Sequence, residues 1–168
     1  MKIVFTGPES TGKSIISSWL STTSGFYLVP EIARPYLESR NIIPQYHDVW
    51  EIGLLQYWEE MYAQQHFSDV VCDTDLLTII IWMEEKFGRC EAFIEERWRN
   101  SIADMYMLCR PDIPWEPDPL RENPYDRDRL FDIHKSKLND AGKPYRIIEG
   151  DWSNRKKLVR DYLNLQDK

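Results

Sequence analysis

Residues 7–14 read Gly-Pro-Glu-Ser-Thr-Gly-Lys-Ser and match the pattern G-x-x-x-x-G-K-[ST] in full. The glycines permit backbone angles that direct successive N–H groups at a phosphate, and the positive end of the following helix faces the same anion. The loop lies between an apolar strand and a helix, which is the context that the pattern requires. We therefore predict a triphosphate site in which Lys13 contacts the terminal phosphates and Ser14 ligates Mg²⁺. The residues expected to contact the nucleotide are Gly7, Glu9, Ser10, Thr11, Gly12, Lys13, Ser14 and Ile15.

Short apolar strands alternate with helices along the chain. This order predicts an α/β fold with a five-stranded parallel sheet covered by helices on both faces. The length of 168 residues suits a single domain over 1–168. Asp48 is expected to cap the long central helix. The expected strands are 2–6, 26–29, 70–72, 105–109 and 145–148, and the expected helices are 13–23, 32–39, 48–67, 76–87, 91–101, 126–139 and 154–165.

Composition excludes several classes of protein. Acidic residues outnumber basic ones, 28 to 21, without a basic run, which argues against a nucleic-acid groove. Cys72, Cys90 and Cys109 show no C-x-x-C spacing, so neither a disulfide framework nor a zinc site is expected. The sequence has no apolar stretch of about 18 residues and no signal-peptide pattern at its start, so we predict a cytoplasmic protein without a membrane span. A homo-oligomer is compatible with these features.

Three acidic residues follow the second and third expected strands. Asp73 comes directly after 70–72, where an acid can hold the water shell of Mg²⁺. Either Asp73 or Glu31 can also receive the proton of the acceptor hydroxyl as a catalytic residue. Asp75 either serves the same site or caps the next helix. Glu31 either accepts the proton of an acceptor hydroxyl, holds a ribose, or is only an acid in the first turn of a helix. Ligands of parallel sheets lie beyond the carboxyl ends of the strands, so we expect Glu31 and Asp73 near the phosphate loop.

A proline-rich connection at about 110–127 is the expected lid. Its prolines exclude a central strand or helix. Arg110, Arg121 and Arg127 either close over the phosphates or form ordinary surface ion pairs. In the long helix, aromatic residues that include Trp58 follow helical spacing, which is typical of a core stripe, although a ring such as Trp58 can also line a substrate pocket.

Several segments together resemble the ribosylnicotinamide kinase domain of the bacterial NadR proteins and their stand-alone relatives. The resemblance covers nearly the whole chain, and its most specific parts are DTDLLT and PDIPW. Two departures stand out: Pro119 lies where the family has glycine in the lid, and Met1 opens directly on the phosphate-loop strand, so the DNA-binding and adenylyltransferase activities of full-length NadR proteins are not expected. The matching segments are 7–14 (GPESTGKS), 29–36 (VPEIARPY), 73–82 (DTDLLTIIIW), 108–115 (LCRPDIPW), 120–122 (LRE) and 150–155.

The resemblance implies a P-loop kinase fold and ATP-dependent phosphorylation of the 5′-hydroxyl of nicotinamide riboside, with Mg²⁺. It places Glu31, Asp73 and Asp75 on the acceptor and metal side, with Ser14 and Asp73 as metal ligands. It further implies that Trp115 and Asp118 lie near the substrate. Arg121 and Arg127 would belong to the lid and act with Lys13 as catalytic groups. Three further residues would lie near adenine: Asp151, Trp152 and Arg155.

Two alternatives stay open. One is a kinase for another nucleoside or small acceptor. A nucleoside monophosphate would need additional Lys or Arg, and the helix at 48–67 has none. The other is a nucleotide-dependent switch or regulatory ATPase, although the sequence lacks the Asn-Lys-x-Asp pattern that reads guanine.

Overall fold

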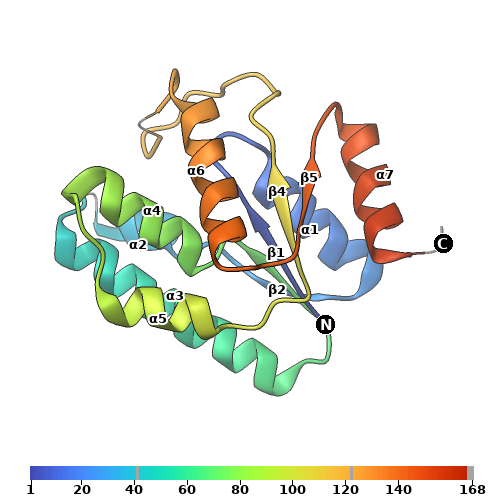
Figure 1. The fold of residues 1–168 in the computed structure, drawn as a ribbon, viewed down its shortest axis with the longest axis horizontal. Helices are drawn as coiled ribbons and strands as arrows, with labels where there is room; N and C mark the ends of the chain where they lie inside the picture. The colour runs from blue at the N-terminus through green and yellow to red at the C-terminus, as the bar shows by residue number, and fades with distance from the viewer. Residues whose placement is uncertain (41, 122, 166–168) are drawn as a thin grey trace.

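The computed structural model describes residues 1–40, 42–121 and 123–165, and it has the expected α/β architecture (Figure 1). Five parallel strands form one sheet in the order β2-β3-β1-β4-β5. The strands are β1 (Lys2–Thr6), β2 (Tyr27–Val29), β3 (Val70–Asp73), β4 (Met105–Cys109) and β5 (Tyr145–Ile148). The helices are α1 (Lys13–Ser24), α2 (Ala33–Arg40), α3 (Tyr46–His66), α4 (Leu76–Phe87), α5 (Ala92–Asn100), α6 (Arg127–Asp140) and α7 (Trp152–Leu163).

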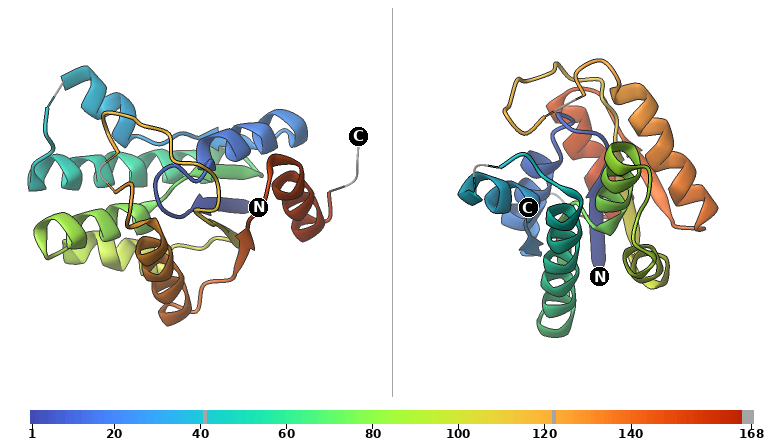
Figure 2. Two further views of the ribbon diagram at one scale, coloured as in Figure 1. Left: turned by 90° about the horizontal axis from the view of Figure 1, so that it is seen from above. Right: turned by 90° about the vertical axis from the view of Figure 1, so that its left-hand side faces the viewer.

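Helices cover both faces of the sheet and give three layers (Figure 2). One apolar core joins Ile3 and Phe5 of β1 to α1 and α7. The other joins Val4 of β1 to α2, α3, α4, α5 and α6. Alternate residues of β1 thus enter different cores, because successive side chains of a strand point to opposite faces. This two-sided burial explains why the strands read as continuous apolar runs.

The predicted elements are present, and the differences lie at their ends. Helix α3 begins at Tyr46, so the prediction that Asp48 caps it was wrong. Gln45 is the N-cap, and Asp48 returns a hydrogen bond by accepting from the Gln45 backbone N–H at 2.9 Å. Helix α7 begins at Trp152, two residues before the predicted start. Its N-cap is Asp151, whose carboxylate accepts from the Asn154 N–H at 2.8 Å.

The register of the sheet brings the phosphate loop and the acidic residues to one edge. β1 lies between β3 and β4, with Phe5 opposite Asp73 and Thr6 opposite Leu108. The residues that follow β1, β3 and β4 therefore leave the sheet side by side. Among the described residues, no helix has the length and apolar character needed to cross a membrane.

Candidate active site

The phosphate loop joins β1 to α1 in an unusual backbone conformation. Gly7 has a φ of 131°, and a Cβ at this position would lie 2.7 Å from the Cys109 carbonyl oxygen. Gly12, the N-cap of α1, has a φ of 76°. Side chains are strained in this region, and the contact at Gly7 leaves no space for a methyl group. Both glycines are thus fixed by geometry, as the sequence pattern predicts.

Hydrogen bonds within the loop hold its shape. The Thr11 hydroxyl donates to the Pro8 carbonyl at 2.8 Å, and the Lys13 ammonium donates to the same oxygen at 2.7 Å. Thr11 is buried, so its side chain supports the loop. Ser14 and Ile15 are exposed at the start of α1. The positive end of α1 and Lys13 thus present local positive charge in an acidic protein.

Asp73 and Glu31 lie beside Lys13 at the carboxyl edge of the sheet. Burial raises the pKa of the Asp73 carboxyl, while a hydrogen bond from Ser14 and the charge of Lys13 oppose the shift. The Oδ1 atom of Asp73 is buried without a hydrogen-bond partner. Burial also raises the pKa of Glu31, opposed by Lys13 and reinforced by the charge of Asp73. The two carboxylates and Lys13 therefore share one electrostatic environment, and Asp73 has an oxygen available for a cation.

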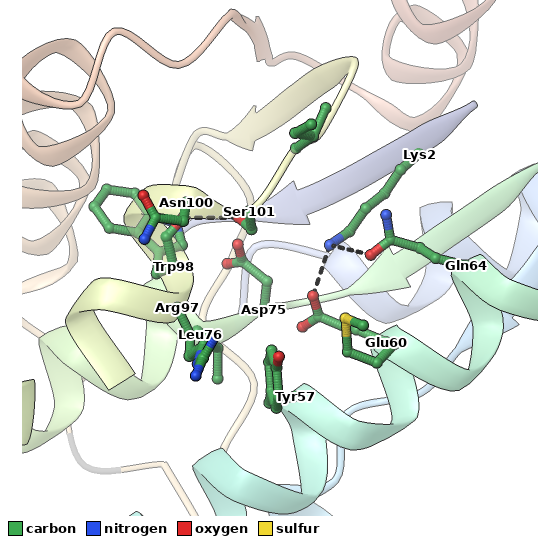
Figure 3. A pocket seen from close by; sticks show the side chains of 12 residues that line it. Lys2, Tyr57, Glu60, Gln64, Asp75, Leu76, Arg97, Trp98, Asn100 and Ser101 are labelled. Carbon is green, nitrogen blue, oxygen red and sulfur yellow. Dashed lines mark hydrogen bonds and ion pairs between the residues drawn. The ribbon is translucent and has the colours of Figure 1, made fainter. Parts of the chain in front are cut away.

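Asp75 turns away from this group, which corrects its assignment to the acceptor and metal side. Its carboxylate caps α4 by accepting from the Leu77 N–H at 3.1 Å and also accepts from the Tyr106 hydroxyl at 2.7 Å. Asp75 lines a cavity of about 240 Å³. Figure 3 shows it in the lining of this cavity with Lys2 and Glu60. With 1% of its surface exposed, Asp75 is a structural cap that lies with Lys2 and Glu60 in the lining of this cavity.

The proline-rich segment 110–127 reaches over the phosphate loop. Arg127 donates to the Ser10 carbonyl at 3.0 Å, and Arg121 lies 3.4 Å from the Ser10 hydroxyl. The same hydroxyl accepts from the Glu116 N–H at 3.0 Å. The Trp115 ring lies near both guanidinium groups, 6.0 Å from Arg121 and 5.7 Å from Arg127. Two of the three predicted lid arginines thus lie at the phosphate loop.

Arg110 does not join them. Its guanidinium forms an ion pair with Glu149 at 2.6 Å and lies over the Phe131 ring at 5.0 Å. The structure does not place Trp58 with the acceptor-side residues either. It is 62% exposed on α3, whereas Gln56, two residues earlier, is buried and accepts from the Ile32 N–H next to Glu31. Residues two apart on a helix point in widely different directions, so the placement of Trp58 in the substrate pocket is not supported.

Arg155 supports the phosphate loop from beneath. Its side chain is fully buried and donates to the carbonyls of Gly150, Thr11 and Arg110, at 2.8, 2.9 and 2.9 Å, and to the Asp112 carboxylate. These acceptors belong to the ends of β4 and β5 and to the loop itself. Arg155 thus positions the loop, and this conformation leaves it no exposed surface for direct contact with a nucleotide.

The other two residues expected near adenine remain accessible. Asp151 is exposed at the start of α7, and Trp152 is partly buried. A Cβ on Gly12 would lie 3.6 Å from the Trp152 ring, which places this ring beside the phosphate loop. Trp152 is thus in a position to contact a bound nucleotide.

Sequence reasoning missed Arg34. Its guanidinium pairs with Asp118 of the lid at 3.0 Å, and its charge opposes the rise that burial causes in the pKa of both Glu31 and Asp73. A signal existed: Arg34 follows Glu31 by only three residues, and α2, which begins at Ala33, holds Arg34 in its first turn directly after the acidic residue. The expected substrate residue Asp118 is engaged by Arg34 and by the Leu120 N–H, at 2.9 Å.

The fold and this site define a P-loop kinase-type architecture. The chain belongs to the AAA domain family, whose model matches residues 2–155. A comparison with curated protein sequences gives no match.

Solved structures share the fold. The NadR protein in complex with NR matches with a TM-score of 0.84 and 18% identity, over 99% of this chain and 52% of that chain. The NadR protein in complex with NAD and AMP-PNP matches with a TM-score of 0.78 and 17% identity, over 99% and 50%. Deoxyadenosine kinase from M. mycoides with dCMP and dCDP matches with a TM-score of 0.73 and 16% identity, over 98% and 99%. The chain therefore spans about half the length of the NadR chains and nearly all of the deoxyadenosine kinase. The P-loop kinase fold expected from the sequence is confirmed.

Proposed function

We propose that this protein is an ATP-dependent kinase that phosphorylates the 5′-hydroxyl of nicotinamide riboside to give nicotinamide mononucleotide. The observation that carries the proposal is the grouping of Glu31 and Asp73 with Lys13 at the carboxyl edge of the sheet, beneath a lid that holds Trp115. The similarity to a NadR structure in complex with NR supports this acceptor.

The acceptor side suits a cationic nucleoside. Glu31 and Asp73 supply negative charge, and Asp118 lies close enough for its charge to raise the pKa of Glu31. A pyridinium ring is attracted to carboxylates and to the face of a Trp ring. Trp115 now lies near Arg121 and Arg127. When the triphosphate draws these arginines toward itself, the ring becomes available to the base of the acceptor.

The transfer uses residues already in place. The 5′-oxygen attacks the γ-phosphorus, the bond from this phosphorus to the β,γ-bridging oxygen breaks, and ADP leaves. Glu31 receives the hydroxyl proton, since burial raises its pKa and makes it a better proton acceptor than an exposed glutamate. Lys13, Arg121 and Arg127 stabilise charge on the transferring group.

The donor set fits Mg²⁺. Asp73 has a buried Oδ1 without a hydrogen-bond partner, and the Ser14 hydroxyl hydrogen-bonds to the same carboxylate. Ser14 and Asp73 would hold the ion, directly or through its water shell. When bound, the ion neutralises charge on the phosphate oxygens.

The test is incubation of purified protein with Mg·ATP and nicotinamide riboside, followed by chromatography of the products. We expect nicotinamide mononucleotide and ADP in equal amounts. Glu31→Gln should lower kcat by about 100-fold or more while leaving ATP binding intact. The matched control, Glu38→Gln on the exposed face of α2, should leave kcat unchanged. ADP release that the riboside does not stimulate would contradict the proposal and favour a regulatory ATPase.

A second candidate is a deoxynucleoside kinase. It is favoured by the match to the M. mycoides deoxyadenosine kinase, which covers nearly all of both chains. Phosphorylation of deoxyadenosine or deoxycytidine in the same assay, with nicotinamide riboside unchanged, would establish this alternative.

A further inference from the structure

Arg34 connects the acceptor side of the sheet to the lid. It lies in the first turn of α2, and its side chain is 38% exposed. One guanidinium nitrogen lies 3.0 Å from Asp118 Oδ2 and 3.4 Å from Glu38 Oε1. Asp118 belongs to the segment 110–127, far from Arg34 in sequence. The pair therefore fixes a long irregular connection to a helix that is itself held by the core.

The rest of the lid is attached elsewhere. Arg127, Arg121 and the Glu116 N–H all contact Ser10 of the phosphate loop. These contacts hold the lid on the nucleotide side. The Arg34–Asp118 pair holds it on the acceptor side, next to Glu31. The lid is thus tied to both halves of the proposed reaction site.

The carboxylate that receives this contact is well oriented for it. Asp118 is only 19% exposed in its side chain, and its Oδ1 already accepts from the Leu120 N–H. The second oxygen, Oδ2, is therefore fixed in direction before it meets Arg34. A carboxylate held in this way loses little side-chain freedom when the ion pair forms, which favours the pair over an ordinary surface contact.

We infer that Arg34 is a positioning residue that latches the lid to α2 through Asp118 and so encloses the acceptor beside Glu31. The inference rests on the proposed kinase function for its effect on turnover, but the latch itself is a property of the free protein. An exposed ion pair has a modest strength, so its loss should raise the open fraction of the lid by about two- to fivefold. Turnover follows, because an open lid admits water and leaves the acceptor less well placed.

The first experiment is amide hydrogen exchange of the free protein. Arg34→Gln and Asp118→Asn should each speed exchange across 110–121 by about two- to fivefold. The double variant should be no faster than the faster single variant, because both remove one contact. Arg34→Lys should keep part of the protection. Glu38→Gln removes the other partner of Arg34 and should leave the lid unchanged.

The second experiment measures kinetics with the acceptor that the protein phosphorylates. Arg34→Gln should raise the KM of the acceptor two- to fivefold and leave the Kd of AMP-PNP unchanged. Unchanged lid exchange in both single variants, or additive effects in the double variant, would overturn the latch whatever the acceptor proves to be. Failure to phosphorylate nicotinamide riboside, with lid exchange altered as expected, would overturn the proposed acceptor and leave the latch standing.

Discussion

Arg155→Met is expected to destabilise the fold before it affects chemistry. The substitution removes a fully buried guanidinium that serves the carbonyls of Thr11, Arg110 and Gly150 and the Asp112 carboxylate. Methionine fills similar space but donates no hydrogen bond. The carbonyls of Thr11, Arg110 and Gly150, which belong to buried or half-buried residues, would then lose this donor, and so would the more exposed Asp112 carboxylate.

The structure sets the size of the effect. Removing one partner of a buried ion pair costs about 3–5 kcal/mol, because the other charge remains without compensation. Asp112 is 28% exposed in its side chain and also accepts from the Gly150 N–H at 2.6 Å. Water and this second donor offset part of the loss, so the lower end of the range applies. We expect the free energy of unfolding to fall by about 3 kcal/mol, which lowers the Tm by about 6 to 12 °C in a domain of this size.

The assay is urea unfolding followed by circular dichroism, with ATP binding measured by calorimetry well below the Tm. Because Arg155 holds the Thr11 carbonyl, ATP affinity should also fall, but as a consequence of a looser loop. The double variant Arg155→Met/Asp112→Leu should recover part of the lost stability, since it removes the uncompensated charge. Lys157→Met, an exposed position on α7, is the control and should stay within about 0.5 kcal/mol of the wild type.

One outcome would refute this reasoning. If Arg155→Met keeps wild-type stability yet no longer binds ATP, the guanidinium contacts the nucleotide directly. The residue would then act near adenine, as the family resemblance implies, and the buried conformation would not be the one that binds the nucleotide.

Three further predictions concern the loop, a buried histidine and the metal. Gly7→Ala should abolish ATP binding. Backbone strain should cost about 1–3 kcal/mol of stability, and the contact of the new Cβ with the Cys109 carbonyl should add to this cost. The control Gly25→Ala has a φ of 76° but open space around its Cβ, so it should cost less and bind ATP normally in calorimetry. Burial lowers the pKa of His134 to about 4 from the 6.5 of an unperturbed histidine, so only the unfolded state binds this proton between these pH values. Stability from this residue should be complete above pH 6.5 and fall by about 3 kcal/mol as the pH drops to 4, and a flat difference in urea stability between wild type and His134→Leu over this range would contradict the assignment. Asp73→Asn should lower kcat by about 100-fold or more and weaken the Mg²⁺ dependence of turnover, and an unchanged Mg²⁺ titration would exclude Asp73 from the metal site.

The sequence by itself determined the elements whose causes are local. The phosphate loop requires glycine at positions with positive φ, and alternating apolar strands and helices leave few topologies other than a parallel sheet. The same logic gave the edge of the sheet where Glu31 and Asp73 meet.

The direction of individual side chains depended on contacts between segments distant in the chain. Asp75 and Asp73 are two residues apart, yet Tyr106 of β4 draws Asp75 away from the phosphate loop. The sequence predicts that Arg155 contacts the nucleotide, whereas in the structure its side chain is hydrogen-bonded to backbone carbonyls at the ends of β4 and β5. Arg34 belongs to the site because the lid, which is distant in sequence, places Asp118 next to it. The local sequence pattern determines which residues lie at the carboxyl edge of the sheet. Packing between helices, strands and the lid determines which hydrogen-bond or ion-pair partner each of these side chains contacts.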